Sequence, residues 1–129
     1  MSRTAVTTAR FQKTFHGRPD QVARVRHQVA AYLDECPVAD DVILIVSEFA
    51  TNAVLHSDSA GEFFTVRCER HAHYVWVEVE DLGGTWHVRP RDGDRAHGLD
   101  IVDTLSGADN WGVELTGDGD RVCWARVEW

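Results

Sequence analysis

The chain has 129 residues, of which 43% are hydrophobic, and it carries a formal net charge of −8 at pH 7. This length predicts a single domain, because domains usually span about 100–200 residues. The acidic balance argues against binding to nucleic acid, which needs clustered cations, and favours a protein partner. No apolar run reaches the ~20 residues that span a membrane, and the N-terminal residues do not resemble a secretory signal. We therefore expect a cytoplasmic protein without membrane attachment.

The cysteines point to the same compartment. Cys36, Cys68 and Cys123 are odd in number and have no Cys-x-x-Cys spacing. Reduced and partly buried thiols are the simplest interpretation of such a set.

The first part of the chain predicts a strand and a helix. Residues 1–8 are expected to form a flexible N-terminus, and residues 9–129 one domain that starts with an edge strand over 9–15. Pro19 and Asp20 open a helix, which is a favoured place for proline, and Pro37 closes it. The apolar residues that follow helical spacing form the expected buried stripe: Val22, Val25, Val29 and Leu33.

A second helix is predicted from about residue 39 to residue 56, and it carries Glu48 and Asn52. Because an α-helix has about 3.6 residues per turn, these two side chains stack on one face. A carboxylate on this ridge can polarise a nucleophile, and an amide oxygen can ligate a hard cation such as Mg²⁺. The same pair also occurs on solvated helix faces. The opposite side is apolar and suits packing on a sheet: it contains Val42, Val46, Phe49, Ala50 and Ala53.

Two strands are predicted next, near residues 62–69 and 73–81. In the second strand valines alternate with Tyr74, Trp76 and two glutamates, so the aromatic residues belong to the outer face. They are either simply exposed there or contact a partner or a second copy of the chain. Asp81 shares the apolar side, as a turn cap or as a ligand group. Gly83 and Gly84 then allow unusual dihedral angles or a close approach to a ligand.

The last part of the chain predicts a long loop, a short helix and a hairpin. Residues 83–97 are too polar for a core element, and such a loop is usually functional or disordered. The helix over 99–105 begins at or just after Gly98, where unpaired backbone N–H groups suit phosphate, although a plain connecting helix is the alternative. Strands near 109–115 and 121–128 flank a turn at 116–120. Together the elements predict an α+β fold of two layers, with a largely antiparallel sheet and helices on one face.

Three motifs in this order resemble the N, G1 and G2 boxes of the GHKL ATP-binding superfamily, which has the Bergerat or histidine kinase-like ATPase fold. Within that superfamily, the small size and the segment around Glu48 look most like the anti-sigma factor serine/threonine kinases. The resemblance covers the chain from about residue 9 to its end. The three motifs are Glu48 with Asn52, then Asp81-Leu82-Gly83, then Gly98-Leu99-Asp100-Ile101-Val102.

The resemblance implies a role for each motif in binding ATP and Mg²⁺. Glu48 would be the catalytic general base and Asn52 the Mg²⁺ ligand. Asp81 would accept the adenine amino group, with Gly83 close to the base. The backbone amides of Gly98 and Leu99 would contact phosphate at the end of a mobile lid. The implied partners are a sigma factor and an antagonist protein phosphorylated on serine, and a homodimer is also implied.

Three positions depart from the family pattern. Thr85 stands where the G1 box usually ends in glycine, and Ala96 stands where the G2 box usually begins with glycine. A Cβ atom at either position restricts the dihedral angles of a phosphate loop. The family often has a threonine in the last strand that supports the adenine-binding aspartate, and this chain offers Val122 or Cys123 there. The departures bear on ATP turnover more than on the fold.

Three functions remain open at this point. The first is an Mg·ATP-dependent serine/threonine kinase of the anti-sigma type. The second is a binding module that retains the fold, has lost catalysis, and regulates a partner by sequestration. The third is a detached ATP-binding domain of a histidine kinase-like system, which is disfavoured because the chain has no pair of dimerisation helices and no phosphoacceptor histidine in a helix.

Overall fold

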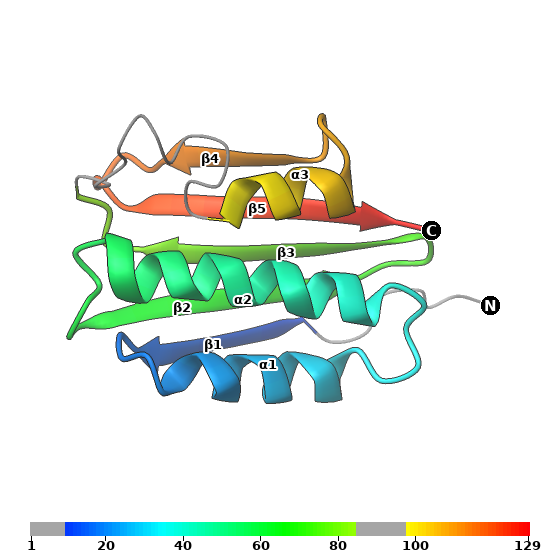
Figure 1. The fold of residues 1–129 in the computed structure, drawn as a ribbon, viewed down its shortest axis with the longest axis horizontal. Coiled ribbons are helices and arrows are strands. Elements are labelled where there is room, and N and C mark those ends of the chain that lie inside the picture. Colours follow the sequence, from blue (N-terminus) through cyan, green and yellow to red (C-terminus); the bar gives the residue numbers. More distant parts are fainter. Residues whose placement is uncertain (1–9, 85–97) are drawn as a thin grey trace.

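The computed structural model describes residues 10–84 and 98–129. Among these residues, five strands form one sheet in the order β1-β2-β3-β5-β4, and each pair of neighbours is antiparallel. The helices of the described residues all lie on one face of the sheet (Figure 1). The elements are β1 (Phe11–His16), α1 (Gln21–Tyr32), α2 (Ala39–His56), β2 (Phe63–Arg70), β3 (Tyr74–Asp81), α3 (Leu99–Ser106), β4 (Trp111–Leu115) and β5 (Arg121–Glu128). The predicted fold class is confirmed.

The inner face of the sheet follows from the alternation of side chains along the strands. In β3, Val75, Val77 and Val79 are at most 1% exposed, whereas Tyr74 and Trp76 alternate with them and belong to the outer face. The pairing of β2 with β3 sets further buried residues beside these valines and so continues the apolar layer. The predicted orientation of this strand is confirmed.

The central helix is α2, which lies over the middle of the sheet (Figure 1). It has the predicted bounds, and its predicted apolar side is completely buried. Arg26 of α1 donates a hydrogen bond to the Ser47 hydroxyl of α2, with a nitrogen–oxygen distance of 3.1 Å. The apolar side of α2 thus fixes the opposite ridge, which carries Glu48, relative to the sheet.

The first helix ends earlier than the sequence predicted. Its last residue is Tyr32, well before Pro37, and the N–H group of Leu33 donates to the Val29 carbonyl oxygen at 2.9 Å. Glu35 then adopts a left-handed conformation with φ of 62°. The chain therefore leaves the helical direction before it reaches Pro37, so the proline does not end the helix. The expected stripe is otherwise present, because Val25, Val29 and Leu33 are fully buried and Val22 packs partly buried against the core.

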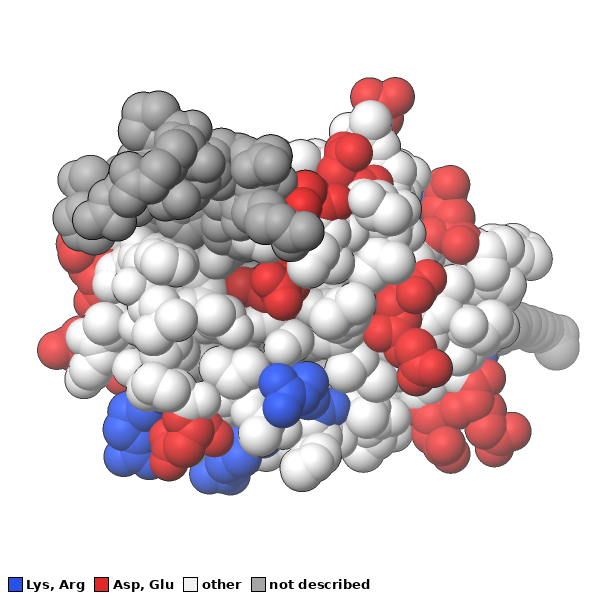
Figure 2. All heavy atoms as spheres, viewed as in Figure 1, with Lys and Arg blue, Asp and Glu red and all other residues white. Residues whose placement is uncertain are grey.

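The helix-covered face is divided by charge. Basic side chains gather over α1, which contains Arg24 and Arg26, with acidic atoms among them, and acidic side chains are spread over the rest of this face (Figure 2). All three cysteines are buried free thiols, as expected. Within the described ranges, no helix is long and apolar enough to cross a membrane.

Candidate nucleotide-binding site

The ridge of α2 carries Glu48 and Asn52, one helical turn apart. Glu48 is partly exposed, whereas Asn52 is only 2% exposed. Burial raises the pKa of the Glu48 carboxyl above its usual value, and the negative charge of Asp100 raises it further. A carboxylate with a raised pKa is a better proton acceptor, which is what a general base requires.

The start of α3 lies directly against Glu48. Gly98 is the N-cap of α3 and adopts a left-handed conformation with φ of 68°. A Cβ atom at this position would collide with the Glu48 carboxylate, so both the backbone angle and the available space require glycine. Leu99 is the first residue of the helix. The structure therefore brings Glu48 of the first motif to Gly98 and Leu99 of the third.

The second motif is a tight turn at the end of β3. Asp81 lies on the inner face and is 2% exposed, and its Oδ1 atom accepts a hydrogen bond from the Gly83 N–H group at 2.7 Å. Gly83 has φ of 74°, and a Cβ atom there would collide with the carbonyl oxygen of Gly119. The carboxylate therefore caps the turn, which confirms the first of the two predicted alternatives, and it lies in the interior. Its role as a ligand group stays a prediction.

The loop after α2 supports this turn, which the sequence analysis missed. The Leu82 N–H group donates to the Oγ atom of Ser59, a fully buried side chain, at 2.8 Å. The Asp58 N–H group donates to the Gly83 carbonyl oxygen at 2.9 Å, and the Asp58 carboxylate lies against Gly84. A polar Ser-Asp-Ser segment at the end of a buried helix is the sequence signal that points to such a clasp.

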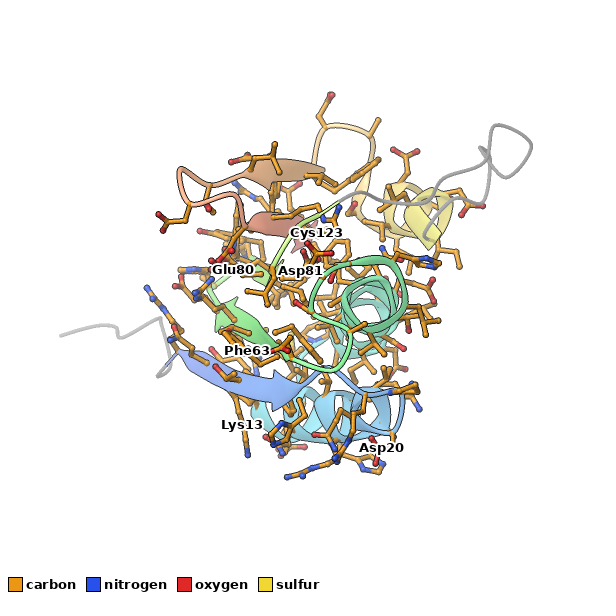
Figure 3. All side chains as sticks on the ribbon, turned by 90° about the vertical axis from the view of Figure 1, so that its left-hand side faces the viewer. Lys13, Asp20, Phe63, Glu80, Asp81 and Cys123 are labelled. Atoms are coloured by element: carbon orange, nitrogen blue, oxygen red, sulfur yellow. The ribbon has the colours of Figure 1, made fainter. Side chains whose placement is uncertain are left out.

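Arg121 is the residue that faces Asp81 from the last strand. The register of β3 and β5 pairs these two residues, and Nε and Nη2 of Arg121 are each 3.4 Å from Oδ2 of Asp81. Both side chains are buried, with 6% and 1% of their surface exposed. The expectation of Val122 at this place is wrong, because Val122 belongs to the outer face. Cys123 is buried one inward position further along and lies near Asp81 (Figure 3).

Burial dominates the electrostatics of this pair. It raises the pKa of the Asp81 carboxyl, and the Gly83 N–H group and the Arg121 charge offset only part of this rise. Burial also lowers the pKa of the Arg121 guanidinium, although the charge of Asp81 opposes that change. Alternation along β5 sets Arg121 on the same face as Cys123 and Ala125 and is the sequence signal for an inward arginine. Its pairing with Asp81 follows only from the register of the two strands.

The contact between Glu48 and Gly98 and the turn at Asp81 both lie beside α2. Glu48 contacts the start of α3 at the middle of the helix, and the clasp on the Asp81 turn begins just after its C-terminus. At 1.5 Å per residue these points are separated by about 13 Å along the helix axis, and Asn52 lies between them. The arrangement suits an elongated ligand with a polar base at one end and an anionic group at the other. Thr85, Ala96 and the predicted lid lie outside the described residues, except for Gly83 and Gly84 at its start.

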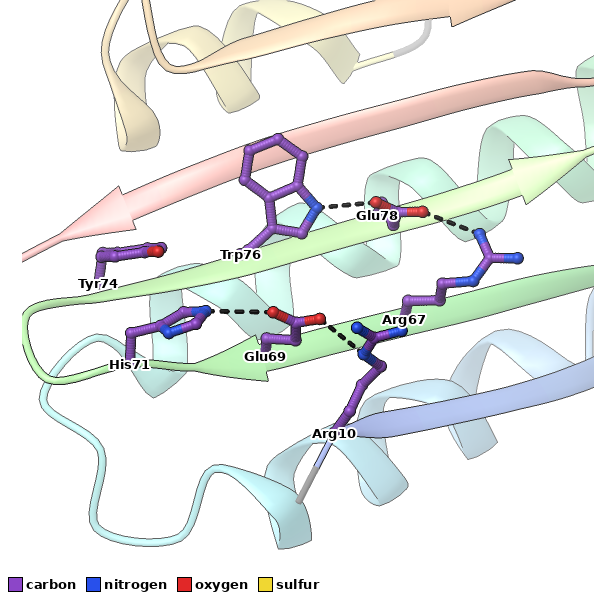
Figure 4. A pocket seen from close by; sticks show the side chains of 7 residues that line it. All are labelled: Arg10, Arg67, Glu69, His71, Tyr74, Trp76 and Glu78. Atoms are coloured by element: carbon purple, nitrogen blue, oxygen red, sulfur yellow. Dashed lines mark hydrogen bonds and ion pairs between the residues drawn. The ribbon is translucent and has the colours of Figure 1, made fainter. Parts of the chain in front are cut away.

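A hollow of about 420 Å³ lies on the outer face of the sheet and contains none of the predicted site residues. The polar groups that line it pair with one another (Figure 4): Arg67 with Glu78 at 2.8 Å, and Glu69 with Arg10 at 2.6 Å and with His71 at 3.2 Å. Its walls include the predicted outer aromatics Tyr74 and Trp76. Trp76 stacks on Trp124, with ring centroids 4.8 Å apart. These contacts form a polar surface on the outer face of the sheet, separate from the site that contains Glu48, Asp81 and Gly98.

Comparison with known proteins identifies the family of the chain. The chain belongs to the histidine kinase-like ATPase domain family, whose model matches residues 15–116. The family resemblance inferred from the sequence is thus confirmed, and the family supports ATP binding as the coarse function.

A solved structure shares the fold. It is the crystal structure of the RsbU and RsbW domains of Rv1364c from Mycobacterium tuberculosis, with a TM-score of 0.68 and 20% sequence identity. The match covers 94% of this chain but only 32% of that one, so the chain spans about a third of its neighbour's length. No curated protein sequence matches the chain.

Proposed function

We propose that the protein is an ATP- and Mg²⁺-dependent serine/threonine kinase of the anti-sigma factor type. The observation that carries the proposal is the contact between Glu48 and Gly98, which sets a carboxylate beside the N-terminus of α3. Backbone N–H groups at a helix N-terminus bind phosphate well, and the helix dipole favours negative charge there. A proton acceptor at the phosphate-binding end of the site is what transfer to a hydroxyl group requires.

Each motif has one role in this proposal. Asp81 accepts a hydrogen bond from the adenine amino group, and the glycine at position 83 lets the backbone approach the base. Gly98 and Leu99 donate backbone N–H groups to phosphate. Asn52 holds Mg²⁺ through its amide oxygen. Its burial, at 2% exposure, supports a site enclosed by protein.

Glu48 orients the serine hydroxyl of the substrate and accepts its proton. The hydroxyl oxygen forms a bond to the γ-phosphorus as the bond from that phosphorus to the β–γ bridging oxygen breaks, and ADP leaves. When bound, Mg²⁺ neutralises charge on the phosphates, which with positioning supplies most of the catalysis in such reactions. The raised pKa of Glu48 supports its role as the base.

The partners in this proposal are proteins. A sigma factor or similar regulator binds the domain, the phosphorylated serine belongs to a small antagonist, and the domain acts as a homodimer. The net charge of −8 supports protein over nucleic-acid partners, and the shared fold with an RsbW domain supports this class of regulator. Such a kinase works in the cytoplasm, where its partners are found.

A titration of nucleotide-stripped protein with ATP tests the site, and a phosphotransfer assay tests the base. Glu48→Ala should abolish transfer to the antagonist while ATP binding persists, and Asn52→Ala should weaken Mg·ATP binding as well. Glu62→Ala is the matched control, because Glu62 is exposed between α2 and β2. Transfer at the wild-type rate in Glu48→Ala would refute the assignment of the base. Absence of binding at millimolar ATP would refute the kinase.

A second candidate function is a binding module without catalysis. Arg121 favours this function, because its guanidinium lies beside Asp81 where the family often has a threonine hydroxyl. Thr85 and Ala96 also depart from the family pattern, and these departures likewise favour a loss of ATP turnover. This protein would sequester its partner with affinity unchanged by Glu48→Ala, and no ATP-dependent phosphoserine would form. Mass spectrometry of the antagonist after incubation with Mg·ATP separates the two candidates.

A further inference from the structure

The pair of Asp81 and Arg121 is a feature that neither the family pattern nor the three motifs assign. Both side chains are almost completely buried, and strand pairing sets them directly opposite each other. A buried charge is costly unless it is paired. A fold that buries this guanidinium must therefore keep a negative charge close to it.

Hydrogen-bond capacity remains on the carboxylate for a ligand. An ionised carboxylate offers about four acceptor directions on its two oxygens. The Gly83 N–H group uses one of them at Oδ1, and Nε and Nη2 of Arg121 lie at 3.4 Å from Oδ2. One further donor can therefore bind Asp81 without displacing either contact.

The protonation state of Asp81 decides which ligand group it can bind. An ionised carboxylate only accepts hydrogen bonds, whereas a protonated one can also donate. The charged and titratable groups around it are Arg121, Asp120 and the Cys123 thiol, and the charge of Asp58 acts on the Arg121 guanidinium. Among these groups only Arg121 is cationic. Its charge opposes the effect of burial, which favours the protonated acid.

We propose that Arg121 is a positioning residue that sets base specificity, because its charge holds Asp81 ionised and oriented to accept from the amino group of adenine. The same carboxylate repels the keto oxygen that hypoxanthine carries at the equivalent position. The proposal rests on the proposed function, since it assumes that Asp81 binds the purine base. It replaces the neutral hydroxyl of the family pattern with an ion pair.

The test compares ATP with ITP, which differs at this base position, over a range of pH. The wild-type protein should prefer ATP by about tenfold or more, because a site built for a donor rejects a ligand that lacks it. In Arg121→Met the preference should fall, with ATP binding weakening most at low pH as Asp81 becomes protonated. Arg121→Lys should restore both the preference and the pH profile. A wild-type ratio and profile in Arg121→Met, or no rescue by lysine, would overturn the inference.

A second measurement does not depend on nucleotide. The pKa of the Asp81 carboxyl, followed by NMR of labelled aspartate, should rise when the cation is removed. Arg121→Gln, which is neutral but polar, provides the reading if Arg121→Met does not fold. Arg126→Met is the matched control in the same strand, since Arg126 lies on the outer face against the Tyr74 ring. An unchanged Asp81 pKa in the folded variant would overturn the inference.

The two proposals fail in different ways. A wild-type protein that binds neither ATP nor ITP contradicts the proposed function, and the specificity of Arg121 falls with it. A wild-type protein that binds ATP while Arg121→Met keeps the same ATP/ITP ratio contradicts the role of Arg121 alone. The kinase and the binding-module functions both retain the base pocket. The ATP/ITP comparison therefore tests the role of Arg121 whichever of the two functions is correct.

Discussion

Arg121 and Arg67 face carboxylates on opposite sides of the same sheet. Arg121 and Asp81 have side-chain exposures of 6% and 1% and meet at 3.4 Å, whereas Arg67 and Glu78 have 27% and 19% and meet at 2.8 Å. Burial lowers the pKa of Arg121. Burial also acts to lower the pKa of Arg67, but the hydrogen bonds that Arg67 donates to Glu78 and Glu80, together with the negative charges of these carboxylates, outweigh it and raise that pKa overall.

The comparison shows that distance alone does not rank ion pairs. The outer pair has the shorter contact, but water can replace either partner there, so its net contribution to stability is small. The inner pair has the longer contact, but loss of one partner leaves a charge where water cannot easily solvate it. We therefore expect the inner pair to matter more for folding despite its geometry.

The largest effect is expected from Asp81→Asn. Removal of the carboxylate charge that faces buried Arg121 should lower the free energy of unfolding by about 3–5 kcal/mol, measured by urea denaturation without nucleotide. Glu78→Gln on the outer face is the matched control. A loss no larger than that of the control would contradict the comparison. Because Asp81→Asn also tests the base pocket, its ATP binding must be measured where the variant remains folded.

The double variant Asp81→Asn/Arg121→Met sharpens this result. Replacement of both members of a buried pair is often nearly neutral, because no charge is left unpaired. The double variant should therefore be more stable than Asp81→Asn alone, which a double-mutant cycle measures as a coupling energy. Simple addition of the two single losses would show that the pair does not act as a unit.

The next effect concerns the contact between Gly98 and Glu48. Gly98→Ala forces a side chain into a left-handed conformation and into the Glu48 carboxylate, so it should cost about 1–3 kcal/mol. Gly61→Ala is the matched control, because Gly61 has φ of +80° and nothing within 4 Å of its Cβ position. The excess cost over the control isolates the contact with Glu48. Equal losses in thermal unfolding would place the two residues further apart than the structure does.

Much of this site could be predicted because its groups are close in sequence or follow a simple period. Helical spacing identified the ridge of α2, and strand alternation correctly set Asp81 on the inner face. The left-handed conformations of Gly83 and Gly98 fit the expected turn and helix start. The roles of Glu48 and Asn52 in binding and catalysis stay predictions, because they concern ligands rather than the fold.

What the sequence analysis missed depends on pairing between distant segments. Arg121 faces Asp81 only through the register of β3 and β5, and a shift of one residue moves every side chain to the other face. Without the register, Val122 and Cys123 were the candidates for this place. The support that Ser59 gives to Leu82 is likewise a contact between a loop and a strand end. The early end of α1 goes with the left-handed conformation of Glu35. Glutamate rarely adopts this conformation, so the residue type gives little sign of it in the sequence.

A smaller effect, of opposite sign, is expected from Glu48→Gln. The folded pKa of Glu48 is raised above its ordinary value of 4.5, so ionisation of this group disfavours the folded state. The protonated Glu48 carboxyl is compatible with the folded state, so its contribution to stability is fully present below about pH 4.5. That contribution is lost as the pH rises through the folded pKa and the group ionises. Glu48→Gln should therefore match the wild type in acid and exceed it at pH 7, by at most about 1 kcal/mol because Glu48 is partly exposed. A stability difference that does not grow with pH in urea titrations would contradict the raised pKa.

The smallest effect is expected from Arg67→Met on the outer face. Arg67 pairs with both Glu78 and Glu80, and all three side chains are partly exposed. Ion pairs that water can reach contribute roughly 0.2–1 kcal/mol, and salt screens them. The loss should therefore be near the lower end of that range and should shrink further in 1 M NaCl, where the screening length is about 3 Å. The loss in Asp81→Asn should persist under the same conditions, because the inner pair is shielded from solvent. A salt-resistant cost of several kcal/mol in Arg67→Met would mean that the outer hollow excludes water when the protein is in solution, as it would if a second copy or a partner covered Tyr74 and Trp76.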